Sequence, residues 1–534
     1  MTNAGFQAKL GWFRISRLGG IVNFPRKQTL KAMFCSLLVA CLLAFSPVWV
    51  SAGEIVQTNA ELVQAFQNLK VVGDDISAMV RFLWKNDEAW YTRWKMIEDA
   101  QKTIDCTYFI IDKDIFGQAY LGLLSKKARQ GVKIRLMVDW RIAHSSYMKG
   151  VIDKLQEFSG LPNVQVKLYN SVVKNLGSLF TDFRKLAANN HDKIIITDEM
   201  TGIIGGRNIG ADYYAGVGEN PIVYRDSDVL MRGSHACKQL KEAFDEEWNY
   251  LKNTIVKPDK INLDNQSARL DLAYRVMSRY IGGRGLYNPK EIPNISDKLR
   301  EALNEMNADV SKYKGITAFS SFDLWRGERA KPLKIIDKNA RTGALNGITP
   351  ALVKFIDASK DEILLQNPYV VLTEIAEAAL ERASKRGVKI VFHSNSGGST
   401  DSLLPQAFLM NDITRLLQKM PTCRFLVAPT EKERLHSKVF VFDRQITVVG
   451  SYNMDPLSEQ VNSEIVAAVN NKQFGTMVAL RIWKDIEGRV VEYKNKVDER
   501  GNVVPAYGPE NHLSPEVVKK MNLMRKLGWI RPLI

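Results

Sequence analysis

Histidine and cysteine are scarce in this chain of 534 residues, which holds six of the first and five of the second. Cys35 and Cys41 lie in an N-terminal apolar run, and the other three cysteines are widely separated. Three scattered cysteines form neither a disulfide framework nor a zinc site, so both are excluded as the basis of the fold. We expect Cys106, Cys237 and Cys423 to be buried as small apolar side chains.

Acidic residues are absent from the first 52 residues, which carry six Lys or Arg. Residues 32–53 hold no charge, and residues 50–52 (Val-Ser-Ala) resemble a small-residue cleavage site. We therefore expect residues 1–52 to be a signal peptide or an N-terminal membrane anchor, with lipidation at Cys41 as a third alternative. The protein is then exported to the cell envelope, where it is periplasmic or membrane-associated.

The charge balance is basic. The net charge is +16 for the whole chain, and removing the six basic residues of the leader leaves +10. This favours an anionic partner, but it does not separate nucleic acid from an anionic membrane surface. An apolar content of 45% excludes a disordered or fibrous chain, and the length requires two or more domains.

Two of the six histidines begin the same short pattern. His191 begins HDKIIITD and His436 begins HSKVFVFD, so both follow His-x-Lys-x-x-x-x-Asp. An asparagine stands 17 residues after each histidine, at Asn208 and Asn453. Equal spacing over such a span indicates that one unit has been duplicated.

The flanking segments repeat as well. Residues 103–136 and 361–392 each contain a β-rich run, an amphipathic stretch with helical spacing, and a second β-rich run. Gly131 and Gly387 stand where a helix C-cap is expected. The pattern predicts an α/β fold with two pseudo-symmetric halves, each a mixed, largely parallel sheet flanked by helices.

The predicted division of the chain follows from this repeat. Residues 298–310 show helical patterning within the connection between the copies, and the basic C-terminus contains a packing helix, for which a membrane-surface role is the alternative. The predicted parts are the leader 1–52, the first half 85–250, the connecting region 251–345, the second half 346–495 and the basic C-terminal extension 496–534.

The spacing within each motif has a chemical consequence. Residues two apart on a strand share a face, so Lys193 lies beside His191 and Lys438 lies beside His436. A hairpin then returns each asparagine toward its own histidine. Lysine and asparagine donate hydrogen bonds to phosphate oxygens that gain charge, while one imidazole attacks phosphorus and the other protonates the leaving oxygen. We take as catalytic candidates His191, Lys193, His436, Lys438, Asn208 and Asn453.

Four acidic residues are candidates for supporting roles. Asp228 and Glu464 occupy matched positions downstream and suit the orientation of a nucleophilic imidazole. Asp198 and Asp443 lie on the opposite strand face from their histidines, so we expect them to fix the hairpin turn or pair with a basic group. No His, Cys or carboxylate cluster has metal-ligand spacing, so we expect neither a metal nor a cofactor.

The remaining histidines have no counterpart in the other copy. We expect surface or core roles for His144, His235, His393 and His512. The loop after the second βαβ unit follows a strand end where ligands bind in open α/β sheets, so it supplies three possible pocket residues, Ser394, Asn395 and Thr400.

The two motifs resemble the paired motifs of the phospholipase D superfamily, and most closely those of bacterial cardiolipin synthase-type members. The resemblance spans about residues 85–495 and is carried by His191-x-Lys193-x4-Asp198 with Gly205-Gly206-Arg207-Asn208, and by His436-x-Lys438-x4-Asp443 with Gly450-Ser451-Tyr452-Asn453. It implies a phosphatidyl-histidine on His191, with His436 as acid and base. It also implies anionic phospholipid and membrane-surface partners, an alcohol or water acceptor, and activity as a monomer. Leu457 departs from the family, which commonly has arginine there.

The leading hypothesis is phosphatidyl transfer that gives cardiolipin-like products. Three alternative functions stay open. Hydrolysis to phosphatidic acid by the same chemistry is the first alternative. A nuclease of the same superfamily is the second, although such nucleases commonly carry one motif per chain, so nucleic acid is not the expected partner. An anion-binding envelope protein without activity is the third.

Overall fold

The computed structural model describes residues 58–69, 77–145, 150–175, 184–258, 263–292, 295–340, 346–430 and 433–533. Residues from Thr58 onward form one compact unit. The predicted leader, residues 1–52, lies outside the described residues. None of the described helices combines the length and the apolar character that crossing a bilayer requires.

The strands occur in two sets separated by a helical connection. The first set is β1 (Ser77–Leu83), β2 (Thr103–Tyr108), β3 (Lys133–Asp139), β4 (Val164–Tyr169), β5 (Ile194–Thr197), β6 (Thr201–Gly205), β7 (Val223–Arg225), β8 (Asp228–Arg232) and β9 (Thr254–Ile255). The second set is β10 (Ala330–Lys338), β11 (Glu362–Gln366), β12 (Lys389–Asn395), β13 (Cys423–Ala428), β14 (Glu433–Leu435), β15 (Val439–Phe442), β16 (Ile446–Gly450), β17 (Glu464–Asn470), β18 (Val491–Val497) and β19 (Val503–Tyr507).

The helices alternate with these strands. Those before and within the first half and the connection are α2 (Ala60–Gln67), α3 (Asn86–Asp99), α4 (Ile115–Arg129), α5 (Trp140–Ala143), α6 (Val151–Ser159), α7 (Val172–Asn175), α8 (Arg184–Ala187), α9 (Ala211–Tyr214), α10 (Ser234–Trp248), α11 (Leu263–Ile281) and α12 (Asp297–Val310). Those of the second half and the C-terminus are α13 (Ile348–Ala358), α14 (Glu374–Lys385), α15 (Leu403–Lys419), α16 (Pro456–Gln460), α17 (Lys472–Ile486) and α18 (Pro515–Met524), followed by the 3₁₀ helix η6 (Gly528–Leu533).

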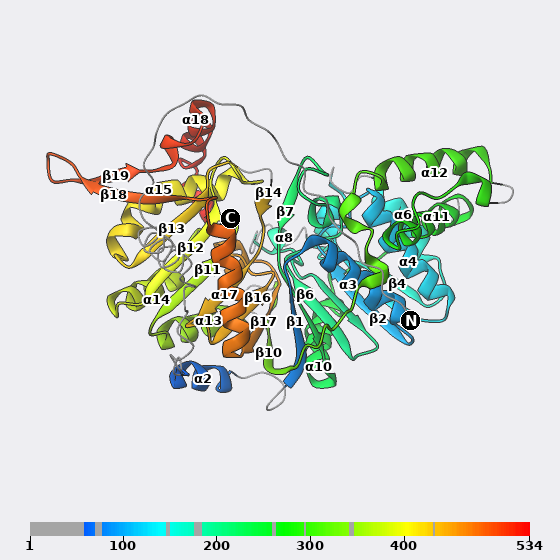
Figure 1. The fold of residues 1–534 in the computed structure, drawn as a ribbon, viewed down its shortest axis with the longest axis horizontal. Coiled ribbons are helices and arrows are strands. Elements are labelled where there is room, and N and C mark those ends of the chain that lie inside the picture. The colour runs from blue at the N-terminus through cyan, green and yellow to red at the C-terminus, as the bar shows by residue number, and fades with distance from the viewer. Residues whose placement is uncertain are drawn as a thin grey trace, which may run out of the picture. The chain divides into compact units, whose positions relative to one another are not determined.

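All strands except β7 and β14 belong to one sheet of 17 strands (Figure 1). Their pairings give the order β9-β4-β3-β2-β5-β6-β8-β1-β10-β17-β16-β15-β11-β12-β13-β18-β19. Reading outward from the β1–β10 pair in either direction passes equivalent strands, because β8, β6, β5, β2, β3 and β4 correspond to β17, β16, β15, β11, β12 and β13. The predicted α/β fold with two pseudo-symmetric halves is therefore confirmed.

The sheet of each half is mixed, but the expectation that it is largely parallel is wrong, because only three strands in each half pair in parallel. β2, β3 and β4 pair in parallel, as do β11, β12 and β13, while the other described pairings of the sheet are antiparallel. The predicted βαβ units are present, with α4 and α14 as their crossover helices. Gly131 and Gly387 follow these helices with φ of 92° and 88°, which is the left-handed conformation that a helix end favours for glycine.

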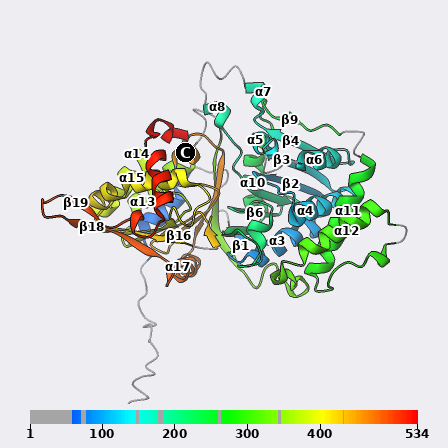
Figure 2. The same ribbon diagram turned by 90° about the horizontal axis from the view of Figure 1, so that it is seen from above.

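Helices cover the outer face of each half, and a shared core fills the inner side. Side chains alternate between the two faces of β5. Ile195 packs toward the outer helices, whereas Ile194 and Ile196 pack in the inner core. That inner core also contains apolar residues of α10 and α17 and of strands from both halves. Figure 2 shows α13, α14 and α15 on one side of the molecule and α4, α11 and α12 on the other.

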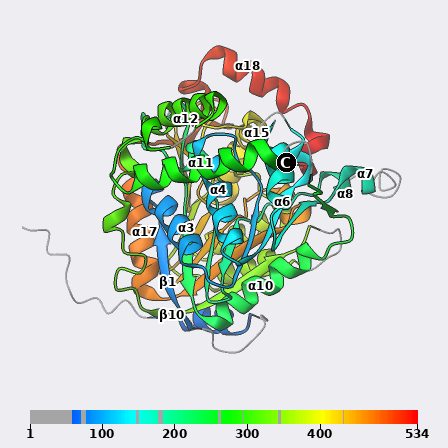
Figure 3. The ribbon, with the colours of Figure 1, turned by 90° about the vertical axis from the view of Figure 1, so that its right-hand side faces the viewer.

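The connecting region covers the first half. Figure 3 shows α11 lying against α4, with α12 beside it, and the predicted helix at 298–310 is α12. Gly122 on α4 allows a close approach, since an added Cβ would stand 2.2 Å from the Leu270 carbonyl oxygen on α11. The three described cysteines, Cys106, Cys237 and Cys423, are free and buried, as predicted.

Candidate active site

The first predicted histidine lies just before β5 and contacts the second half. Nδ1 of His191 lies 3.0 Å from each carboxylate oxygen of Glu464, the first residue of β17. The backbone N–H of His191 donates to Ser463 O at 3.2 Å, and that of Ser463 donates to Asn189 O at 2.9 Å. These backbone bonds between the halves hold the carboxylate against the imidazole.

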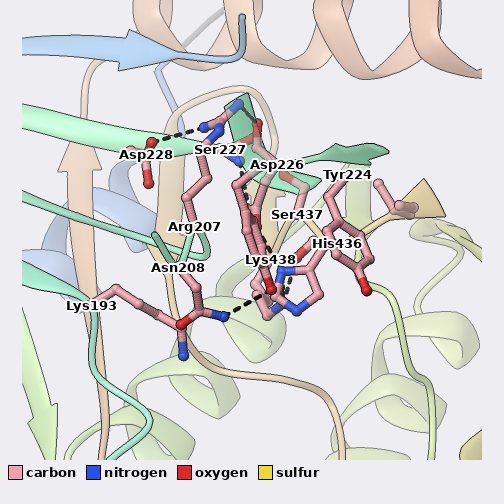
Figure 4. Close-up of polar contacts among 12 residues, drawn as sticks. Lys193, Arg207, Asn208, Tyr224, Asp226, Ser227, Asp228, His436, Ser437 and Lys438 are labelled. Atoms are coloured by element: carbon pink, nitrogen blue, oxygen red, sulfur yellow. Dashed lines mark hydrogen bonds and ion pairs between the residues drawn. The ribbon is translucent and has the colours of Figure 1, made fainter. Parts of the chain in front are cut away.

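The second histidine repeats this arrangement in the opposite direction. Nδ1 of His436 lies 2.6 Å from Oδ2 of Asp226, which belongs to the first half (Figure 4). Strand β14, which leads into His436, pairs in parallel with β7, which leads into Asp226. The N–H of His436 donates to the carbonyl oxygen of Arg225 at 2.8 Å. Each histidine is therefore oriented by a carboxylate of the other half, a crossed arrangement that requires both halves.

Asp228 does not orient a histidine, so that prediction is wrong. Its carboxylate accepts from Arg93 at 2.9 and 3.0 Å and from Arg207 at 2.8 Å, and all three side chains are buried. Arg207 also donates to the carbonyl oxygen of Asp226 at 2.5 Å. Figure 4 shows Arg207 between Asp228 and the Asp226–Ser227 backbone. Asp228 thus supports the backbone of the residue that contacts His436.

A two-residue offset between the halves explains the error. The glycines that end β6 and β16 are equivalent, and their cross-strand partners in the register are Asp228 for Gly205 and Val466 for Gly450. Two residues before each partner stands an acid, Asp226 in the first half and Glu464 in the second. Because side chains along a strand alternate between its two faces, an error of two residues leaves the side chain on the same face. Matching Asp228 to Glu464 in the sequence therefore agreed with this alternation although it selected the wrong acid.

The motif lysines lie beside their histidines as predicted. Nζ of Lys193 donates to His191 O at 2.6 Å, and Nζ of Lys438 lies 3.0 Å from Nδ1 of His436 and donates to its carbonyl oxygen. Burial lowers the pKa of Lys193 to about 7 and that of Lys438 to about 8. Burial therefore weakens the hold of each lysine on its proton, and an anionic ligand beside the lysines would stabilise their charged forms.

The two histidines differ in their electrostatic surroundings. Burial, with the nearby Lys193 and Lys438 ammonium groups, holds the pKa of His191 well below its usual range. The pKa of His436 is also lowered by burial and Lys438, but Asp226 opposes that effect. Burial raises the pKa of Glu464 to about 7, whereas the pKa of Asp226 is lowered, because His436 and Lys438 outweigh its own burial. His436 therefore faces the more firmly ionised carboxylate.

The predicted asparagines also lie at the site. Nδ2 of Asn208 donates to the Tyr213 hydroxyl at 2.8 Å, and the Tyr213 ring packs 5.6 Å from the ring of His436. The N–H of Asn453 donates to Ser458 Oγ at 3.2 Å, and that hydroxyl donates to Glu464 at 2.6 Å. Oδ1 of Asn453 is buried without a hydrogen-bond partner among the described residues. A group with spare hydrogen-bonding capacity at this position suits a polar ligand.

Asp198 and Asp443 hold hairpin turns away from the pocket, as predicted. Asp198 has a φ of 52° and accepts from three backbone N–H groups that lead into β2, at 2.6 to 2.9 Å. Asp443 has a φ of 46° and accepts at 2.9 Å from three N–H groups that lead into β11, and also from Asn59. Each aspartate therefore ties its β-hairpin to the neighbouring strand of the parallel set, β2 in the first half and β11 in the second.

The other sequence candidates have structural partners. His393 is buried, with its pKa lowered to about 3 by burial, and its Nδ1 contacts Gln366 at 3.0 Å. Asn395 exchanges hydrogen bonds with the Leu435 backbone and so supports the approach to His436. Ser394 and Thr400 bond to nearby carbonyl oxygens, those of Pro368 and Ser402.

Several residues at the site had no sequence signal. The rings of Tyr224 and Phe109 lie 5.1 Å from His436 and 5.3 Å from His191. The carboxylate of Asp401 accepts from Tyr369 at 2.6 Å and from Tyr224 at 3.2 Å. These residues stand outside the repeated motifs, so the repeat could not reveal them. Among the described residues, no group of His, Cys, Asp and Glu is arranged as a metal site.

Comparison with known proteins agrees with the paired geometry. The family model described as "Cardiolipin synthase, PLD-like domain" matches residues 94–248 and 352–486, one stretch in each half and together more than half of the chain. Cardiolipin synthase C of Escherichia coli is 26% identical over 423 residues, which span 75% of this chain and 83% of that protein. Cardiolipin synthase A of Pseudomonas syringae is 25% identical over 408 residues, spanning 76% of this chain and 68% of that protein.

Solved structures show the same fold. A phosphatidylserine synthase of Haemophilus influenzae matches with a TM-score of 0.58 at 11% identity, over 90% of this chain and all of that chain. At that identity the likeness concerns the fold alone. The family match, in contrast, falls on both motif-bearing halves. The chain belongs to the cardiolipin synthase family of phospholipase D-like enzymes.

Proposed function

We propose that the protein is a phosphatidyltransferase that joins phospholipids through a phosphohistidine intermediate and yields cardiolipin-like products. The crossed pairs His191–Glu464 and His436–Asp226 carry this proposal, because they orient two buried imidazoles that lie beside buried lysines and are close enough for His436 to lower the pKa of His191. The cardiolipin synthases among its relatives support phospholipid as the substrate class.

In the first step, Nε2 of His191 attacks the phosphorus of a donor phospholipid. Its Nδ1 faces Glu464, so a proton held there leaves the Nε2 lone pair free, and the lowered pKa keeps this imidazole neutral. The bond from phosphorus to the headgroup oxygen breaks with its electron pair on oxygen. His436, supported by the ionised Asp226, donates the proton that this leaving oxygen requires.

In the second step, the acceptor hydroxyl gives its proton to His436 and attacks the same phosphorus. The bond between phosphorus and His191 breaks, and the histidine returns to its neutral form. The ammonium groups of Lys193 and Lys438 face the charge that grows on the non-bridging oxygens. Asn208 bonds to Tyr213, which packs on His436, and Asn453 is linked through Ser458 to Glu464, so both amides stand beside the groups that react.

The acceptor is proposed to be the free hydroxyl of a second phospholipid headgroup. Leu457, in the position where related synthases commonly carry arginine, packs against the inner core instead of extending a cation to the pocket. Water is the competing acceptor, and its use would give phosphatidic acid.

A direct assay separates these outcomes. The purified protein is incubated with vesicles that contain labelled phosphatidylglycerol, and lipid products are separated by mass spectrometry. A parallel incubation contains plasmid DNA. Formation of a diphosphatidyl product with release of glycerol supports the proposal. Phosphatidic acid alone would establish hydrolysis, and DNA cleavage without lipid turnover would overturn the assignment in favour of a nuclease.

We also propose export to the cell envelope and activity as a monomer. The apolar, uncharged residues 32–53 support export. Both motifs and both crossed carboxylates stand in one chain, which supports activity without a second copy. Mass spectrometry of the mature N-terminus and light scattering of the active species test the two statements, which an intact cytosolic chain or an obligate dimer would contradict.

A further inference from the structure

The C-terminal segment, residues 515–533, presents an apolar surface to solvent. Leu523 at the end of α18 is 68% exposed, Leu527 is 39% exposed, and Trp529 in η6 is 78% exposed. Large apolar side chains that gather within seven residues and face solvent are unusual for the surface of a folded protein. We call Leu523, Leu527 and Trp529 the apolar tip.

The apolar tip stands on a segment that is packed from behind. Met521 is buried in a small cluster with Leu513 and with Ala407 and Met410 of α15. Ile530 packs against a second small cluster, Val371 and Phe408. Arg531 donates to Asp412 at 2.5 Å. The exposed side chains are therefore held outward by a fixed backbone.

The same segment is strongly basic. Residues 515–533 contain five basic residues and one acidic residue, Glu516, which gives a net charge of +4. The four exposed basic side chains are Lys519, Lys520, Arg525 and Lys526. Basic side chains beside exposed tryptophan and leucine match the interface of an anionic bilayer, where the apolar groups enter the headgroup layer and the cations meet phosphate.

The C-terminal segment packs against elements that lead to the active site. η6 packs on α16, the short helix that begins directly after Asp455 in the second motif region. The loop under Ile530 is tied to the same region, because the N–H of Val371 donates to Met454 O at 2.9 Å. Figure 1 shows α18 at the same end of the second half as β14, which leads into His436.

We propose that residues 515–533 dock the enzyme on the surface of an anionic phospholipid bilayer, with the apolar tip inserted in the headgroup layer. This inference rests on the proposed action on phospholipid, because docking would bring the active site to its substrate. Insertion of the tryptophan and the leucine that removes about 60 to 110 Å² of apolar surface from water, at about 25 cal/mol per Å², is expected to strengthen binding about 10- to 100-fold.

Local hydrogen–deuterium exchange on the full-length protein tests the docking surface. Vesicles of phosphatidylglycerol should slow exchange in peptides covering residues 515–533, and vesicles of phosphatidylcholine should do so much less. This readout is confined to the segment, so vesicle contact by another part of the chain does not mimic it. Equal exchange with and without phosphatidylglycerol vesicles would overturn the proposal. Protection by added DNA or protein in place of vesicles would also overturn it.

A variant of the apolar tip and a matched control variant test whether docking affects enzyme activity. Replacement of Leu523 and Trp529 by serine should lower turnover of lipid in anionic vesicles about 10- to 100-fold. Turnover of a short-chain, monomeric phospholipid should not change, which also shows that the variant is folded. The control is Leu480→Ser, a 58% exposed leucine on α17; Figure 2 shows α17 on the other side of this half from the C-terminal end. It should leave both activities unchanged.

The outcomes keep the two proposals apart. Vesicle-dependent protection that is lost in the double variant, without phospholipid turnover by any form, would support docking and refute the proposed function. Full turnover in vesicles by the double variant would refute docking and leave the phosphatidyltransferase intact.

Discussion

The crossed carboxylates predict that each acid acts on the histidine of the opposite half. Glu464→Gln and Asp226→Asn are the informative changes, since each replaces a buried carboxylate with an amide of similar size. Glu464 contacts His191 through both oxygens at 3.0 Å, and Asp226 contacts His436 through one oxygen at 2.6 Å. Loss of either removes the group that selects the imidazole tautomer, so we expect a fall in kcat of about 10²- to 10⁴-fold.

This loss corresponds to about 3 to 5 kcal/mol of transition-state stabilisation, at about 1.4 kcal/mol for each tenfold change. The folded structure should survive both changes. Ser451 and Ser458 bond to the Glu464 carboxylate at 2.5 and 2.6 Å, and their hydroxyl groups can rotate to accept from an amide. Thermal unfolding of both variants checks this expectation.

The assay compares a phospholipid with a nitrophenyl phosphodiester, whose leaving group needs no proton. Glu464→Gln should be slow with both substrates, because it impairs attack by His191. Asp226→Asn should be slow with the phospholipid but should release a normal first-turnover burst of nitrophenol, followed by slow turnover. The reverse pattern, a burst with Glu464→Gln and none with Asp226→Asn, would refute the crossed assignment.

The remaining predictions concern stability, packing and pH. Asp443→Ala removes the acceptor of three backbone N–H groups, so it should lower the free energy of unfolding by about 2 to 4 kcal/mol in urea titrations; an unchanged midpoint would contradict this. Gly122→Ala forces a methyl group against the backbone of α11 and should cost about 1 to 3 kcal/mol, whereas Gly528→Ala, with open space around it, should cost little. Because the pKa values of Lys193 and Lys438 are lowered to about 7 and 8, raising the pH through this range removes positive charge and should lower kcat/KM; a flat profile to pH 10 would contradict the role of these lysines.

The repeated motifs made much of the fold predictable. Identical spacing placed His191, Lys193 and Asn208 in one half and their counterparts in the other, and the βαβ pattern identified the parallel strands. Side-chain periodicity also separated Asp198 from the pocket, because the opposite face of a strand is determined by counting residues.

The partners of the histidines could not be predicted in the same way. Asp226 lies in the link between β7 and β8, two residues before Asp228, so counting by alternation does not separate the two acids, and only the pairing register and the contact with His436 do. The exchange between halves depends on the short β7–β14 pair, which joins segments far apart in the chain. Tyr224 lies on β7 and Asp401 lies in the loop before α15, and both stand outside the repeated motifs, so spacing gave no information on them.

The covalent intermediate tests the central claim most directly. His436→Ala protein is mixed with a nitrophenyl phosphodiester, quenched without acid, digested and analysed by mass spectrometry. We predict a phosphoryl adduct on His191, because attack continues while the acceptor can no longer be activated, and no adduct in the His191→Ala protein. An adduct on His436 in the His191→Ala protein, or no adduct in any variant under these conditions, would contradict the mechanism.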